Sequence, residues 1–152
     1  MIAAIRQFLA ELAGERSPAR FGEDDYRLAA AALLVHVIAI DGVVSDEERA
    51  KLREILRERF ALSSEETDAL IAAATSADNE AVDLYGFTSV LKRHYDEAGR
   101  DRIVEMMWEL TFADGTLHEF EDNLIWRVAE LLGVSTRTRV RLKREARSAS
   151  GQ

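Results

Sequence analysis

The stretch DGVVSDEE (residues 41–48) returns in outline as DGTLHEFE (residues 114–121), seventy-three positions further along the chain. Each stretch follows a strongly apolar segment and precedes an amphipathic one, and each has a glutamate seven residues after its aspartate. Because Asp-Gly favours a tight turn, both stretches are predicted to join two helices. The sequence therefore predicts an internal repeat, at approximately residues 25–76 and 98–147.

The segments around the two turns have helical periodicity. Residues 24–40 are apolar on nearly every side, as expected for a helix surrounded by others. After the first turn, Ser45 and Glu48 have the capping-box spacing that starts a helix. Helices are also predicted over residues 2–14, from Ser63 to about 75–78, over about 80–95, around 103–110, around 124–132 and from Ser135 to about Arg147, with Gly133 as a helix stop.

Apolar positions coincide when the two copies are aligned on their Asp-Gly pairs. Leu33 then corresponds to Met106, and Leu52 corresponds to Ile125. Two similar helix–turn–helix units are therefore predicted to pack around a shared core with approximate twofold symmetry. Two copies are too few for a solenoid.

The composition indicates an all-α protein. The chain has one proline and eight glycines, is rich in Ala, Leu, Glu and Arg, and shows no long period-two alternation. Its 152 residues are enough to bury a core without a stabilising metal or disulfide. We predict one compact domain over residues 1–152, with about seven to eight helices.

Charge and cysteine content exclude several classes of function. With no cysteine, the chain has no disulfide, thiolate nucleophile or thiolate metal site. The net charge of −8 argues against nucleic-acid binding. The apolar run 28–40 is shorter than the roughly 20 residues of a membrane-spanning helix, and residues 2–9 lack an export signal. We therefore expect a cytoplasmic protein.

The two turns present a set of possible metal ligands: Asp41, Glu48, Asp114 and Glu121, with His118 as a nitrogen donor. If the turns face each other, their carboxylates suit Mg²⁺, Mn²⁺ or Ca²⁺, and the histidine would also suit Zn²⁺. They are not EF-hands, because the early ligand positions hold apolar residues. The alternative is that the glutamates only cap the following helices. Both interpretations remain open.

Other polar residues have mainly structural interpretations. His36 is interpreted as a partly buried structural histidine, and His94 as a surface residue near a helix end. The last helix is strongly basic, carrying Arg137, Arg139, Arg141, Lys143, Arg144 and Arg147. It is either a solvated face or a contact for an acidic protein, an anionic lipid or phosphate, with at most weak attraction to membranes. No common catalytic motif is present, so an enzyme is not expected.

The chain resembles the TerB-like tellurite-resistance family. The resemblance lies in IVEMMWELTFADG (residues 103–115), continuing through Glu121 to LLGV (131–134), and in IDGVVS (40–45) and LYGFT (84–88). It spans most of residues 25–145. The second turn departs from the pattern by carrying His118 in place of the serine of the first copy.

The resemblance implies a compact all-α fold with an acidic site at the Asp-Gly turns, onto which Asp41, Glu48, Asp114 and Glu121 map. It also implies a bacterial stress-response system linked to metal binding at the inner face of the membrane. We therefore expect a non-enzymatic domain that binds a divalent cation or a protein partner through the turns. The alternative is a protein-interaction scaffold whose turns serve only as helix caps.

Overall fold

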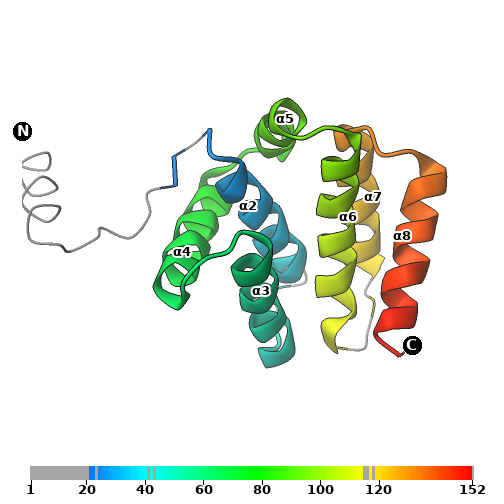
Figure 1. Cartoon of the computed structure of the whole chain (residues 1–152), viewed down its shortest axis with the longest axis horizontal. Helices are drawn as coiled ribbons and strands as arrows, with labels where there is room; N and C mark the ends of the chain where they lie inside the picture. Colours follow the sequence, from blue (N-terminus) through cyan, green and yellow to red (C-terminus); the bar gives the residue numbers. More distant parts are fainter. Residues whose placement is uncertain are drawn as a thin grey trace, which may run out of the picture.

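The computed structural model describes residues 21–22, 24–40, 42, 44–114, 117 and 119–151, with only the backbone of Asp114. Within them the chain forms seven α-helices, one short 3-10 helix and no strand, which confirms the all-α class (Figure 1). The helices are α2 (Tyr26–Ala39), α3 (Asp46–Arg59), α4 (Ser64–Glu80), α5 (Tyr85–His94), α6 (Glu97–Thr111), η1 (Phe112–Asp114), α7 (Glu119–Leu132) and α8 (Thr136–Ala149). The predicted helix over residues 2–14 lies outside the described residues.

Helices α2 and α6 form the centre of the molecule. They pack against each other, α2 is also covered by α4 and α5, and α6 is covered by α7 and α8. Figure 1 shows α2, α3 and α4 on one side, α6, α7 and α8 on the other, and α5 above them. Leu33 is 1% exposed and its counterpart Met106 is 3% exposed, so the two central helices are buried at matching positions.

The two halves also exchange contacts across their boundary. Helix α3 of the first half packs on α6, and its counterpart α7 packs on α2. Leu52 on α3 and Ile125 on α7 are both buried at these matching places. This pattern agrees with a duplicated unit, whose limits at 25–76 and 98–147 stay a prediction.

Short-range signals set most helix ends. The side chains of Ser45, Ser63 and Ser135 each accept a hydrogen bond from a backbone N–H in the following turn, as their spacing predicts. At the end of α7, Gly133 has φ of 74°, and the N–H of Val134 donates to the carbonyl of Ala129 at 2.9 Å. These are the marks of a Schellman stop, so the predicted role of Gly133 is confirmed.

Helix α4 runs further than its sequence suggests. It ends at Glu80 rather than near residues 75–78, and α5 begins only at Tyr85. Two of the polar side chains that were expected to end the helix, Thr75 and Asp78, instead make hydrogen bonds within the folded structure. The Thr75 hydroxyl donates to the carbonyl of Ile71, and Asp78 contacts His36 on α2 at 2.8 Å. Tertiary packing therefore overrides the local break.

Candidate functional site

The first acidic turn is built around Glu48, the third residue of α3. Its Oε1 accepts a hydrogen bond from the Ser45 N–H at 3.1 Å, and its own N–H donates to Ser45 Oγ at 3.1 Å. Gly42 has φ of 81°, which a glycine adopts without strain. The Glu48 residue is only 4% exposed. The predicted capping box is therefore present, and it holds a buried carboxylate at the start of α3.

The second turn places a glutamate at the same point of the following helix. Glu121 is the third residue of α7 and is 2% exposed. Asp114 ends η1, and only its backbone is described. Asp41 and His118 lie outside the described residues. The structure thus locates the side chains of two of the five predicted metal ligands, Glu48 and Glu121. Each is the third residue of the helix that follows its turn.

Each turn lies beside an element of the other copy. Helix α3 packs against η1, and a groove between them is lined by Glu47, Lys51 and Ala113. A second groove is lined by Ile40, which precedes the first turn, and by Leu124 on α7. The start of α3 is therefore close to the backbone that carries Asp114, and α7 is close to the backbone that leads to Asp41.

The groove between α3 and η1 is bordered by a charged network. Arg59 Nη2 donates to Glu105 Oε1 and to Glu109 Oε1, at 3.0 Å each, and joins α3 to α6. Burial raises the pKa of Glu109, and the neighbouring Glu105 adds to the rise while Arg59 opposes it. Two carboxylates therefore share the Arg59 guanidinium between these helices, and Lys51 also opposes the rise in the Glu109 pKa.

In the part of the chain that is described, no group of three or more His, Asp or Glu side chains is arranged to hold a metal ion. Three of the five predicted ligands are not among the described side chains. A cation site that combines both turns accordingly stays a prediction.

The histidines make contacts that join helices. His36 Nδ1 lies 2.8 Å from Asp78 Oδ1 and links α2 to α4, in agreement with a structural role. His94 is exposed, but its ring stacks on Tyr26 with centroids 3.6 Å apart. The sequence carried no signal for either partner, because each lies more than forty residues away.

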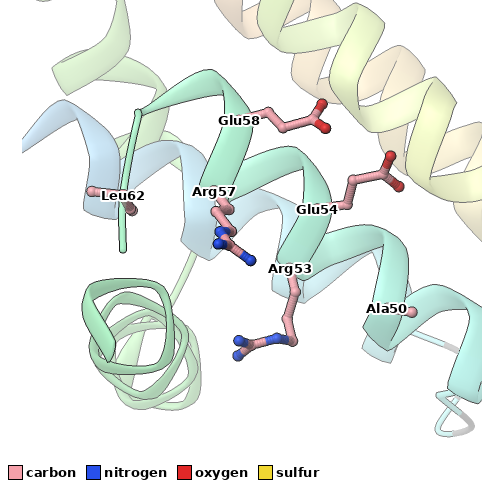
Figure 2. A pocket seen from close by; sticks show the side chains of 6 residues that line it. All are labelled: Ala50, Arg53, Glu54, Arg57, Glu58 and Leu62. Carbon is pink, nitrogen blue, oxygen red and sulfur yellow. The ribbon is translucent and has the colours of Figure 1, made fainter. Parts of the chain in front are cut away.

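A shallow hollow on α3 has a different character. Figure 2 shows Arg53 and Arg57 pointing to one side of the helix, with Glu54 and Glu58 on the other. The two arginines and the two glutamates lie on neighbouring sides of the same helix. They do not converge on a common point as ligands of a small molecule would.

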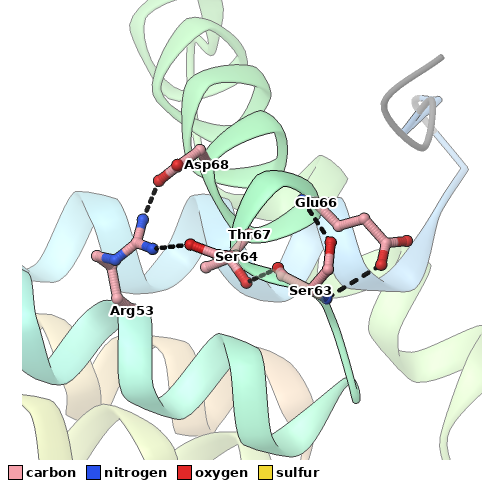
Figure 3. Close-up of polar contacts among 6 residues, drawn as sticks. All are labelled: Arg53, Ser63, Ser64, Glu66, Thr67 and Asp68. Atoms are coloured by element: carbon pink, nitrogen blue, oxygen red, sulfur yellow. Dashed lines mark hydrogen bonds and ion pairs between the residues drawn. The ribbon is translucent and has the colours of Figure 1, made fainter. Parts of the chain in front are cut away.

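Arg53 is used to connect α3 with α4. Its guanidinium pairs with Asp68 and donates to Ser64 Oγ at 3.0 Å (Figure 3). The adjacent box between Ser63 and Glu66 starts α4. This network explains how α4 is held on α3, and it has no evident role in binding.

The basic helix α8 has two kinds of cation. Arg139 pairs with Glu130 at 2.6 Å, and Lys143 pairs with Asp122 at 2.9 Å, so both hold α8 on α7. Arg137 and Arg144 make no ion pair among the described residues, and Arg141 is paired only with Glu145 on its own helix, at 3.6 Å. The outward side of α8 is therefore a row of solvated arginines.

Comparisons with known proteins place the chain in a family. No helix of the described residues has the length and apolar character needed to cross a membrane. The chain has no match among curated protein sequences. The crystal structure of a protein of unknown function from Porphyromonas gingivalis W83 is similar, with a TM-score of 0.61 at 17% identity, over 86% of this chain and 98% of that one. This likeness concerns the fold alone.

The family described as "Tellurite resistance protein TerB" matches residues 27–144, which cover both Asp-Gly turns and all seven α-helices except the ends of α2 and α8. The chain belongs to the TerB family of tellurite-resistance proteins.

Proposed function

We propose that this protein is a non-enzymatic stress-response domain of the tellurite-resistance type, which binds a divalent cation or a basic protein partner through its two Asp-Gly turns. The observation that carries the proposal is the matched burial of Glu48 and Glu121 at the third position of α3 and α7. A carboxylate taken out of water is costly unless charge or hydrogen bonds compensate it. Two buried carboxylates at equivalent places support a shared role for the two turns.

The packing supports a joint site. Because α3 packs against η1, the helix that carries Glu48 lies next to the element that ends in Asp114. Carboxylate and water oxygens are the ligands of Mg²⁺, Ca²⁺ and Mn²⁺, and participation of His118 would favour Zn²⁺. The proposed setting is the bacterial cytoplasm, including the inner face of the membrane.

A second candidate function is a protein-interaction scaffold in which the turns only cap helices. The complete capping box of Ser45 and Glu48 favours it, since that box by itself gives the Glu48 side chain a hydrogen-bonded role. The two candidates differ in whether the turns respond to a metal ion.

Calorimetric titration of the metal-free chain with Mg²⁺, Ca²⁺, Mn²⁺ and Zn²⁺ distinguishes them. If one ion joins the turns, Asp41→Asn and Asp114→Asn each weaken binding, and the double variant loses less than the sum because the ligands are coupled. Asp46→Asn, an exposed acid in the first turn of α3, is the matched control. Silence for every ion would remove the cation from the proposal and leave the scaffold.

A further inference from the structure

One groove of the molecule is open and lined mainly by apolar side chains. It lies between α2, the α4–α5 connection and α7. Its larger apolar lining residues are Ile40, Val82, Leu84, Tyr85, Leu124 and Leu131, and four ionisable side chains also line it. We call it the Tyr85 groove. Val82 is 99% exposed and Tyr85 is 66% exposed, which makes them two of the four large apolar side chains exposed among the described residues. A third, Phe120, lies one helical turn before Leu124 on α7.

The fold does not require this groove to be apolar. Aligned on the Asp-Gly pairs, its counterpart in the other copy is the groove between α3 and η1. There Lys51 stands in place of Leu124, and Ala113 stands in place of Ile40. At the position of Lys51 and Leu124 the groove is thus charged in one copy and apolar in the other, whereas Glu54 and Arg127 place a charge in both. An exposed apolar cluster of this kind marks a contact surface.

The chain contains one segment suited to cover the groove. Residues 2–14 are predicted to form an amphipathic helix with Ile2, Ile5, Phe8, Leu9 and Leu12 on one side. A helix of this length is marginal in water unless its apolar side is packed. The segment also lies outside residues 27–144, the part that matches the family. We propose that residues 2–14 dock as a helix in the Tyr85 groove of the same chain.

The connection is long enough for such docking. The groove is near the end of α2, and the 14 residues of that helix span about 21 Å. Residues 15–20 join the segment to Phe21 and reach roughly 20–24 Å when extended. Tethering also raises the local concentration of the segment to the millimolar range, which favours an intramolecular contact over an external one.

Charge supports the same pairing. In a helix over residues 2–14, Arg6 lies beside one edge of the apolar side and Glu11 lies beyond the other. The Tyr85 groove has Asp83 on the α4–α5 connection and Arg127 on α7, which are different walls. One orientation of the docked helix therefore places opposite charges together at both edges.

The absence of cysteine makes a direct test possible. A nitroxide on Val82→Cys in the full ¹⁵N-labelled chain is expected to attenuate the amide signals of residues 2–14 at least threefold more than a nitroxide on Arg137→Cys, on the outward side of α8. Adding Ile5→Asp and Leu9→Asp should abolish the difference. Equal attenuation from both labels would overturn the proposal.

Two further measurements distinguish docking within one chain from docking of a second copy and from an empty groove. Mixing ¹⁵N-labelled chain with unlabelled nitroxide-bearing chain must give no attenuation, because attenuation there would mean that a second copy fills the groove. In unlabelled protein, hydrogen exchange of residues 2–14 should quicken about tenfold in Tyr85→Ser and stay unchanged in Tyr85→Phe. Exchange that is equally fast in all three proteins would show that no helix is docked.

Discussion

Single residues at two helix ends show the cost of a left-handed backbone. Gly133 ends α7 with φ of 74°, whereas Ala61 ends α3 with φ of 50°. The N–H of Leu62 donates to the carbonyl of Arg57 at 3.0 Å, so the end of α3 has the same bond as the Schellman stop of α7. A side chain at this position meets the steric penalty that glycine avoids. The first copy therefore carries strain that the second does not.

Exchanging the two residue types should have opposite effects. Ala61→Gly is expected to raise the free energy of unfolding by about 0.5–1 kcal/mol, because Ala61 is exposed and loses no packing. Gly133→Ala should lower it by about 1 kcal/mol. Urea denaturation of both variants measures the changes. A destabilised Ala61→Gly protein would contradict this account of the α3 end.

Tyr95 should make the stability of the folded protein depend on pH in the alkaline range. Burial raises its pKa from 10.0 to about 12, and the nearby Tyr26 contributes. The unfolded chain then loses this proton before the folded chain does, so stability should fall as the pH rises from 10 to about 12. In Tyr95→Phe, which keeps the ring contacts with Tyr26 and His94, the fall should be shallower. Urea midpoints measured across this pH range test the difference.

At the scale of elements, what the sequence predicts depends on how far apart the partners are. The caps at Ser45, Ser63 and Ser135 and the stop at Gly133 join residues within five positions, so local spacing was sufficient. The end of α4 was misplaced because Asp78 is held by His36, forty-two positions away. Long-range packing of this kind leaves no local pattern.

In the candidate site, too, some features follow from local spacing and others from long-range packing. The residue types of the two acidic turns, and the helix starts at Glu48 and Glu121, follow from spacing. That both glutamates are buried, and that α3 lies against η1, follows from how the halves pack. The sequence could therefore name the ligands of a site but not their distances.

The cap of α4 offers a test of how much one hydrogen bond stabilises an element. Ser63→Ala removes the acceptor for the Glu66 N–H and should lower the free energy of unfolding by about 1 kcal/mol. Ser64→Ala is the neighbouring control, because the Ser64 hydroxyl accepts its hydrogen bond from the half-exposed Arg53, and it should cost less than half as much. Equal losses in thermal or urea unfolding would show that the box contributes no more to α4 than the Arg53–Ser64 hydrogen bond does.

Positive and negative charges are unevenly distributed over the molecule. Residues 135–152 carry six arginine or lysine side chains and one glutamate, a charge of +5, so the rest of the chain carries −13 to reach the net −8. Arg139 and Lys143 neutralise acids on α7, whereas Arg137, Arg141 and Arg144 point outward. An anionic surface would thus be attracted to one face and repelled by the remainder.

Attraction of this kind should be weak and sensitive to salt. We predict partial co-sedimentation with phosphatidylserine vesicles at low ionic strength and none at physiological salt, since screening reaches about 8 Å there. The triple variant R137Q/R141Q/R144Q should lose the low-salt binding. The control R49Q/R57Q/R102Q removes the same charge from the body and should retain more of it, because these arginines lie on other helices. Binding that survives high salt would require an apolar insertion surface, for which the exposed Val82, Tyr85 and Phe120 would be the first residues to replace.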